Sequence, residues 1–429
     1  MLRALAHRNF RLFFFGQGVS LIGTWMQQVA MSWLVYDLRH SAFLLGMIGF
    51  ASQIPTFFVT PLAGVFTDRW NRHRTLLVTQ SIALAQAALL TVLALGHWVA
   101  VWNLLALSVL LGLVNAFDIP TRQAFLTEMV GNPEDRANAI ALNSSLFNGA
   151  RLIGPALAGL LIADQGEWFC FLLNTISYLA VLAALTFVRV PPRDHRREHP
   201  PVLTGLKEGL LYAFRSPPIR ALLALVGLVS CMSMPISVLL PVFITESFGG
   251  GAKALGQLTA AQGLGSLAGA LYLASRRTVL GLGKRIALAA SAVGLGMIGF
   301  SWASGFWTAA AALLVAGCGL MVQMAACNTI LQTIVDEDKR GRVMSLHAMA
   351  FMGMAPLGSL IAGWLAGVIG PPATVRLGGA ACIVGALLFF RQLKNLRHHI
   401  RPIYIRAGIL PEIAAGMEAA SELTAPRRG

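Results

Sequence analysis

Long apolar stretches alternate with short polar breaks along almost the whole chain. Reading between the breaks gives twelve stretches, close to or longer than the roughly 20 residues that an α-helix needs to cross a bilayer. They lie near residues 12–36, 43–66, 75–96, 99–121, 138–163, 168–188, 219–245, 254–274, 286–303, 306–333, 343–369 and 374–391. The pattern therefore predicts an all-α membrane protein with twelve transmembrane helices.

The composition excludes a soluble globular protein. Hydrophobic residues fill 56% of the 429 positions and charged residues only 12%, about half the charged fraction of a soluble domain. A net charge of +15 is also found in nucleic-acid-binding proteins, but here Lys and Arg stand in short runs between apolar stretches. Nucleic-acid binding needs basic residues gathered on one folded face, so we expect no nucleic-acid partner.

The basic residues predict the orientation of the chain. Of the 33 Lys and Arg residues, 29 fall in the termini and loops on one side of the predicted spans, and Arg39, Lys253 and Arg376 fall on the other. Cytoplasmic loops of membrane proteins carry the excess of Lys and Arg. We therefore expect a multi-pass protein of the cell inner (cytoplasmic) membrane with both termini in the cytoplasm.

The chain also repeats itself. A shift of 204 residues brings Gly154 onto Gly358 and Gly159 onto Gly363, in the fifth and eleventh predicted spans. The longest internal polar interval divides the spans six and six, so we expect an N-terminal bundle at 1–188, a cytoplasmic linker at 189–217, a C-terminal bundle at 218–391 and a cytoplasmic tail at 392–429. Two parallel six-helix repeats are typical of secondary transporters that bind their substrate between the halves.

The loop between the second and third spans carries glycine, acidic and basic residues at fixed spacing: Gly64, Asp68, Arg69 and Arg72. It resembles the G-x-x-x-D-R-x-G-R-R/K signature of the major facilitator superfamily, with Asn71 in place of the second glycine and His73 in place of a basic residue. In that family the loop is a latch of the cytoplasmic gate, and the resemblance implies this role for the four matching residues. The corresponding segment of the second half has Leu273 where the acid would stand.

The fifth span contains Gly149, Gly154, Pro155 and Gly159. Glycines let a neighbouring helix approach closely, and a proline bends the helix. This segment resembles the G-P-x-x-G antiporter motif of facilitator exporters, with Ala158 where a first glycine is common. The resemblance favours export over import.

Two further features point to a subfamily of the major facilitator superfamily. Asp118 and Arg122 stand four residues apart at the end of the fourth span, where they can pair on one helix face. With Arg151 and the Gly-Pro element, they resemble the subfamily that includes the enterobactin exporter and related secretion-type permeases. A cation at membrane depth is costly, so we expect Arg151 either to bind an anion or take part in proton coupling in a central cavity, or to form a fixed pair with an acid such as Asp118.

Proton coupling in exporters commonly uses a buried carboxylate, and Asp118 and Glu246 are the candidates. Polar residues inside the apolar spans either line the cavity or hydrogen-bond between helices. They include Gln27, Gln28, Asn148, Asn174 and Asn328.

We therefore expect a secondary active transporter of the major facilitator type. The leading interpretation is proton-coupled efflux of a small amphipathic molecule, siderophore-like or drug-like, by a monomer that uses the proton gradient across the lipid bilayer. Uptake, uniport and a non-transporting sensor are the alternatives. An enzyme would need His, Asp or Glu residues that converge at membrane depth. The spans show no such cluster, so we expect no enzyme and no cofactor. The five cysteines are scattered without a C-x-x-C pair, which argues against a disulfide framework and a metal site.

Overall fold

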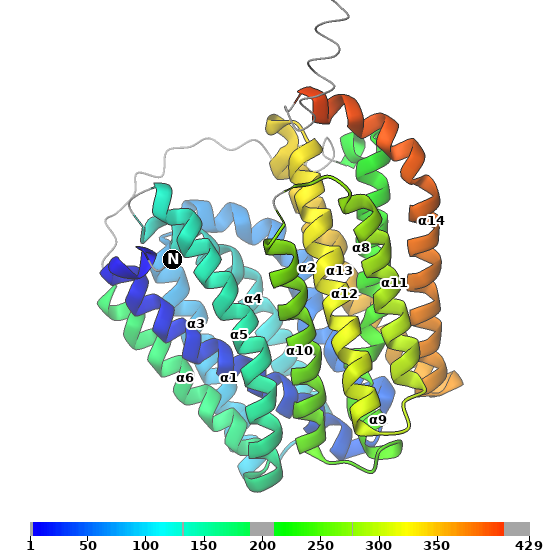
Figure 1. Cartoon of the computed structure of the whole chain (residues 1–429). Coiled ribbons are helices and arrows are strands. Elements are labelled where there is room, and N and C mark those ends of the chain that lie inside the picture. Colours follow the sequence, from blue (N-terminus) through cyan, green and yellow to red (C-terminus); the bar gives the residue numbers. More distant parts are fainter. Residues whose placement is uncertain (1–2, 131–132, 189–209, 277, 407–429) are drawn as a thin grey trace, which may run out of the picture.

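The computed structural model describes the chain except residues 1–2, 131–132, 189–209, 277 and 407–429. Across the described residues all regular structure is helical, and no strand is present (Figure 1). The predicted all-α class is therefore confirmed.

The first half begins with a short 3₁₀ helix, Arg3–Ala6, and continues with six long helices. These are α1 (Arg8–Arg39), α2 (Ala42–Arg69), α3 (Arg72–Leu95), α4 (Val101–Glu128), α5 (Pro133–Gln165) and α6 (Glu167–Phe187). The second half contains α8 (Pro217–Val238), α9 (Leu240–Glu246), α10 (Ala252–Ala274), α11 (Leu282–Ser301), α12 (Phe306–Ile334), α13 (Glu337–Ile369) and α14 (Pro371–Arg406). The helices follow the expected order of spans.

Ten segments of the described chain are long and apolar enough to cross a membrane, with α8 and α9 counted together. Helices α1 and α10 are not in that group, because Gln and Gly residues lower their hydropathy. Both nevertheless pack among the spans, α1 against α5 and α6 and α10 against α12 and α5. The twelve-helix architecture is thus complete, and its two least hydrophobic members are covered by other helices.

The seventh predicted span is not one continuous helix. It breaks at Leu239, between α8 and α9, with Pro235 inside the first piece and Pro241 in the first turn of the second. Proline removes a backbone donor and clashes with the preceding turn. Hydropathy alone did not reveal this break, since Val238 and Leu240 on either side of Leu239 are apolar.

The helix pairs of the first half recur in the second. Helix α1 packs on α5 and α6, α2 packs on α4, and α3 packs on α4 and α6. Equivalently, α8 packs on α13 and α14, α10 packs on α12, and α11 packs on α12 and α14. The internal repeat read from the sequence is therefore a repeat of six-helix bundles with the same packing.

Two helix pairs make most of the contact between the halves, α5 with α10 and α2 with α13. A Cβ atom on Gly159 would lie 2.8 Å from the backbone of Gly256, and one on Gly363 would lie 2.8 Å from the carbonyl oxygen of Ala42. Since real Cβ atoms do not approach so closely, both contacts need glycine. Gly159 and Gly363 are the residues that the 204-residue shift relates, so the two contacts are equivalent.

Both contacts lie on one side of the molecule. We call the side that bears the N-terminus and the end of α14 the tail side, and the opposite side the far side. Gly159 and Gly363 stand near the far-side ends of their helices. In contrast, a Cβ on Gly149, further toward the tail side of α5, would meet no atom within 4 Å. Figure 1 shows the halves converging at the far side, near α9, and diverging at the tail side.

The ends of the two bundles extend beyond the predicted spans. Residues 210–215, at the end of the expected linker, are helical, and the Tyr212 hydroxyl donates to Asp336 Oδ2 at 3.1 Å. Most of the expected linker lies outside the described residues. Helix α14 continues to Arg406, well past the expected end of the last span at residue 391.

Glycine-to-alanine substitutions on α13 should lower stability where the glycine contacts another helix and not where it faces open space. We expect Gly363→Ala to destabilise the protein by about 1–3 kcal/mol, because the added methyl overpacks the contact with α2. Gly367→Ala is the matched control, since its Cβ would meet nothing within 4 Å and alanine favours the helix by about 0.5–1 kcal/mol. Thermal unfolding in detergent measures both, and equal midpoints for the two variants would contradict the close contact.

Candidate functional site

The predicted gate loop joins α2 to α3 on the tail side. Gly64, Asp68 and Arg69 lie on the last turns of α2, and their side chains fall outside the described residues. Arg72 opens α3, and its Nη1 donates to Glu128 Oε1 at the end of α4, at 2.5 Å. The latch role of Asp68 stays a prediction. Glu128 is a partner that the sequence analysis missed, because no local spacing links it to Arg72.

The two departures from the facilitator signature both have structural roles here. Asn71, in place of the second glycine, is the N-cap of α3, and its Oδ1 accepts from the backbone N–H of Arg74 at 3.1 Å. The His73 ring lies 2.7 Å from the carbonyl oxygen of Leu185 on α6. These residues therefore fix the start of α3 against its neighbours.

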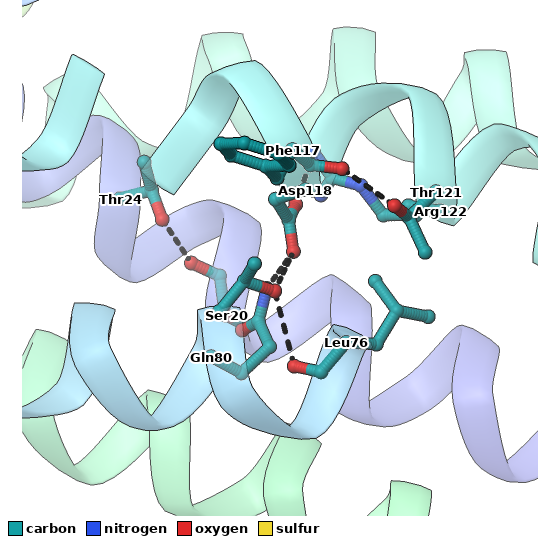
Figure 2. Close-up of polar contacts among 9 residues, drawn as sticks. Ser20, Thr24, Leu76, Gln80, Phe117, Asp118, Thr121 and Arg122 are labelled. Carbon is teal, nitrogen blue, oxygen red and sulfur yellow. Dashed lines mark hydrogen bonds and ion pairs between the residues drawn. The ribbon is translucent and has the colours of Figure 1, made fainter. Parts of the chain in front are cut away.

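Asp118 lies at the centre of a buried polar cluster between α3 and α4. Its Oδ1 accepts from Thr79 at 3.1 Å and from Gln80 at 2.7 Å. Its Oδ2 forms an ion pair with Arg122 Nη2 at 3.1 Å. Figure 2 shows Asp118 facing Gln80, with Arg122 one turn further along α4. The predicted pairing of Asp118 with Arg122 is thus present, because α4 remains helical through Pro120.

The cluster supplies a donor to each oxygen of the carboxylate. With Asp118 only 3% exposed, both of its oxygens are satisfied by donors, as buried charges require. Protonation would remove the ion pair and one acceptor. A role in proton transfer therefore needs a second conformation in which these donors have moved.

Arg151 on α5 has a different environment. Its guanidinium carbon lies 5.7 Å from the centre of the Trp25 ring on α1, and that ring meets Phe147 edge to face at 5.8 Å. No carboxylate in the described part of the chain forms an ion pair with Arg151. The alternative of a fixed pair with Asp118 is therefore wrong, since Asp118 pairs with Arg122.

Arg151 also marks the boundary between the halves. A Cβ atom on Gly263 of α10 would lie 3.2 Å from the Arg151 carbonyl oxygen. The residue thus stands where α5 of the first half meets α10 of the second, with its guanidinium over the Trp25 ring of α1. An unbalanced cation at this depth is costly, and a cation over an aromatic face recovers only part of that cost.

The glycines of the antiporter-like segment make different contacts. A Cβ on Gly154 would lie 2.9 Å from the carbonyl oxygen of Ile22 on α1, within the first half. Gly159 faces α10 across the boundary. There, a Cβ atom on Gly256 would also lie too close to the carbonyl oxygen of Pro155. Gly149 faces open space. The segment therefore holds α5 against α1 and α10 at the same time.

Glu246 lies away from this cluster. It is exposed at the end of α9 on the far side, where its Oε1 accepts a hydrogen bond from the Tyr36 hydroxyl of α1 at 2.8 Å. It links the halves there, and the structure does not bring it near Asp118 in α4.

The remaining polar candidates are dispersed. Gln28 is exposed on α1, while Asn148 Nδ2 donates to the Ser144 carbonyl oxygen of its own helix at 2.9 Å. On α12, Asn328 Oδ1 accepts from Gln332 at 2.5 Å. The described contacts of Asn148 and Asn328 are therefore made within their own helices.

A buried amide chain ties α1, α3 and α6 together. Gln27 Nε2 donates to Gln86 Oε1 at 3.1 Å, and Asn174 Nδ2 donates to Gln27 Oε1 at 2.7 Å. All three side chains are buried. For Gln27 and Asn174 the structure thus supports hydrogen bonding between helices rather than a place in a cavity.

Comparison with known proteins places this geometry in a family context. The family model MFS_3, described as transmembrane secretion effector, matches residues 1–400. The staphyloferrin A transporter of Staphylococcus aureus is 26% identical over 394 residues, covering 90% of this chain and 97% of that protein. The multidrug efflux pump Tap of Mycolicibacterium fortuitum is 28% identical, covering 86% and 92%. Macrolide efflux protein A of Streptococcus pyogenes is 25% identical, covering 89% and 96%.

Solved structures share the fold. The peptide transporter POT aligns with a TM-score of 0.72 at 11% identity, covering 90% of this chain and 94% of that one. A bacterial homologue of the iron transporter ferroportin, in an inward-facing state, aligns with a TM-score of 0.69 at 18% identity, covering 90% and 98%.

Removing the carboxylate at position 118 should leave Arg122 without its partner. We expect Asp118→Asn to destabilise the protein by about 3 kcal/mol, because breaking one side of a buried pair strands the other charge. The double variant Asp118→Asn/Arg122→Gln should recover part of the loss. A double-mutant cycle on thermal unfolding in detergent measures the coupling between the two residues, and additive losses would show that the pair contributes no stability.

Proposed function

The chain belongs to the transmembrane secretion effector family of the major facilitator type, and from this premise we propose that it is a proton-coupled exporter of a small amphipathic molecule. The family makes it a multi-pass membrane protein and a secondary transporter of small molecules rather than an enzyme. We propose in addition the direction of transport, the coupling ion, the orientation in the membrane and the class of substrate.

We propose that the tail side faces the cytoplasm and that the membrane is the cell inner membrane. The support is the distribution of charge, since 29 of the 33 Lys and Arg residues belong to the termini and loops of that side. Both termini are then cytoplasmic.

The observation that carries the proposal is that the glycine contacts joining the halves lie on the far side, while the helices diverge toward the tail side (Figure 1). With the tail side in the cytoplasm, we propose that this conformation faces the inside of the cell, as the loading state of an exporter would. We propose that residues 1–188 and 218–391 rock against each other as two units of a monomer. Residues 189–217 act as the linker, and residues 392–429 form the tail.

Export is favoured over import by the relatives. Two of those compared are named as efflux proteins, and a third as a transporter of staphyloferrin A. The Gly-Pro segment of α5, which holds both α1 and α10, is the motif that resembles exporters.

We propose that Arg151 binds an anionic group of the substrate, with Trp25 and Phe147 against its apolar part. The Arg151 guanidinium has no carboxylate partner among the described residues, so it can form charge-assisted hydrogen bonds to a carboxylate or phenolate of the substrate. The adjoining rings offer apolar surface at the boundary between the halves. This chemistry fits an amphipathic anion, such as a siderophore, better than a lipophilic cation.

Asp118 is the proposed proton carrier, because it is the buried carboxylate whose donors come from two helices, α3 and α4. Relative movement of those helices would change its hydrogen bonds and so its affinity for a proton. Asp68 and Arg69 would latch the tail side in the closed state, with Arg72 held in place by Glu128.

The test is efflux from energised cells that make the wild type, Arg151→Gln, Arg151→Lys or Asp68→Asn. A catecholate siderophore and a fluorescent lipophilic cation serve as substrates, each with and without an uncoupler. We expect wild-type cells to export the siderophore and the uncoupler to stop export. Arg151→Gln should lower siderophore export about ten- to hundredfold, because a charge-assisted hydrogen bond is lost, and Arg151→Lys should retain part of it.

The variant Arg39→Gln, which removes a far-side charge, is the control and should export normally. Export of the cation but not of the siderophore, unaffected by Arg151→Gln, would contradict an anionic substrate. Uncoupler-resistant movement would indicate uniport, and accumulation in place of efflux would indicate uptake. No movement of either compound by a correctly inserted protein would favour a sensor.

A further inference from the structure

A cavity of about 400 Å³ lies at the tail side of the second half, away from the boundary between the halves. The ends of α8, α11, α12 and α14 surround it. Its deeper residues, Leu222, Ile330 and Phe389, belong to apolar membrane-spanning segments. The cavity is therefore apolar on its membrane side.

The last turns of α14 form the outer wall. Figure 1 shows this part of the helix, drawn in red, lying across the tail-side end of the second half. Leu393, Leu396 and Tyr404 are buried there, while Lys394 and Arg401 are exposed. This segment is thus amphipathic, with its apolar face on the bundle and its cations at the mouth of the cavity.

The mouth is basic. Lys284, Lys394, His398 and Arg401 line it, and no acidic residue is among its described lining residues. None of the three Lys and Arg side chains forms an ion pair within the described ranges. Among these lining residues, no carboxylate would repel a bound anion.

The start of α11 adds further donors at the same place. Gly281, which lines the cavity, is the N-cap of this 20-residue helix and provides no side-chain cap. The free N–H groups of a helix N-terminus attract anions. One turn on, Arg285 Nη1 is buried without a hydrogen-bond partner in the described chain, about 4.0 Å from where a Cβ of Gly281 would lie.

The position of the basic side chains relative to the ends of the apolar spans points to the ligand. The apolar spans on either side begin at Leu282 and end at Leu396, so Lys284, Lys394 and Arg401 lie where a bilayer has its phosphates. We infer that this cavity binds an anionic phospholipid of the tail-side leaflet, with the phosphate at the basic mouth and an acyl chain among Leu222, Ile330 and Phe389. The inference requires only that the chain spans a membrane and does not depend on the proposed export.

Native mass spectrometry of the purified full-length protein in mild detergent tests this inference. Phosphatidylglycerol, phosphatidylethanolamine and inorganic phosphate are titrated separately, and bound molecules are counted. We expect phosphatidylglycerol to bind most tightly. Lys394→Gln/Arg401→Gln should weaken its binding about tenfold or more, since each basic residue near the surface strengthens attraction to anionic lipid.

Two controls separate this site from general attraction to the protein. Arg39→Gln/Arg376→Gln removes the same number of charges from the far side and should leave the phosphatidylglycerol affinity unchanged. Gly283→Leu fills the apolar interior, because a Cβ added at this position would already lie 2.9 Å from a Leu393 methyl. It should reduce lipid binding while the basic mouth remains. Thermal unfolding of each variant checks that it is folded.

Equal phosphatidylglycerol binding by the mouth variant and the far-side control would overturn the inference. So would equal affinity for phosphatidylethanolamine, since the basic mouth would then select nothing. If inorganic phosphate competes with the lipid and Gly283→Leu has no effect, the site binds a free anion and the lipid assignment is wrong.

Discussion

The structure depends on close contact of backbones between the halves, at Gly159 with Gly256 and at Gly363 with Gly46. In a bilayer the hydrophobic effect does not drive helices together, so their association relies on van der Waals packing and on small residues that let backbones approach. These two contacts bury no charge. In the proposed rocking movement, separation at these glycines would break no ion pair. Within the first bundle, buried hydrogen bonds such as Gln27 to Gln86 add to the helix packing.

The polar chemistry is concentrated in the first half. The shift of 204 residues that relates α5 to α13 carries Arg151 onto Ala355, and the same shift carries Asp118 onto Val322 and Arg122 onto Ala326. The second half thus keeps the glycine contact and loses the charges. The repeat therefore preserves the glycine contact between the halves, whereas Asp118, Arg122 and Arg151 occur in the first half alone.

The sequence predicted the helices, their order, the repeat and the Asp118 pair, because hydropathy, a fixed shift and helical spacing are local properties. It did not predict that Arg72 bonds to Glu128, or that Gln27 bonds to Gln86 and Asn174. These choices depend on how neighbouring helices are rotated, which a single sequence does not reveal. The end of α14 was missed for another reason. Its amphipathic turns alternate charged and apolar residues, so they do not read as an apolar span.

The placement of Arg151 has an electrical consequence. A cation that is accessible alternately from the two sides of a membrane senses the transmembrane potential, which is worth about 2.3 kcal/mol per elementary charge for each 100 mV. In the proposed transport cycle, an inside-negative potential would favour the empty protein with Arg151 open to the cytoplasm, the state proposed to load substrate. Once an anion neutralised the guanidinium, that bias would be removed, and the membrane voltage would not oppose outward movement of the loaded protein.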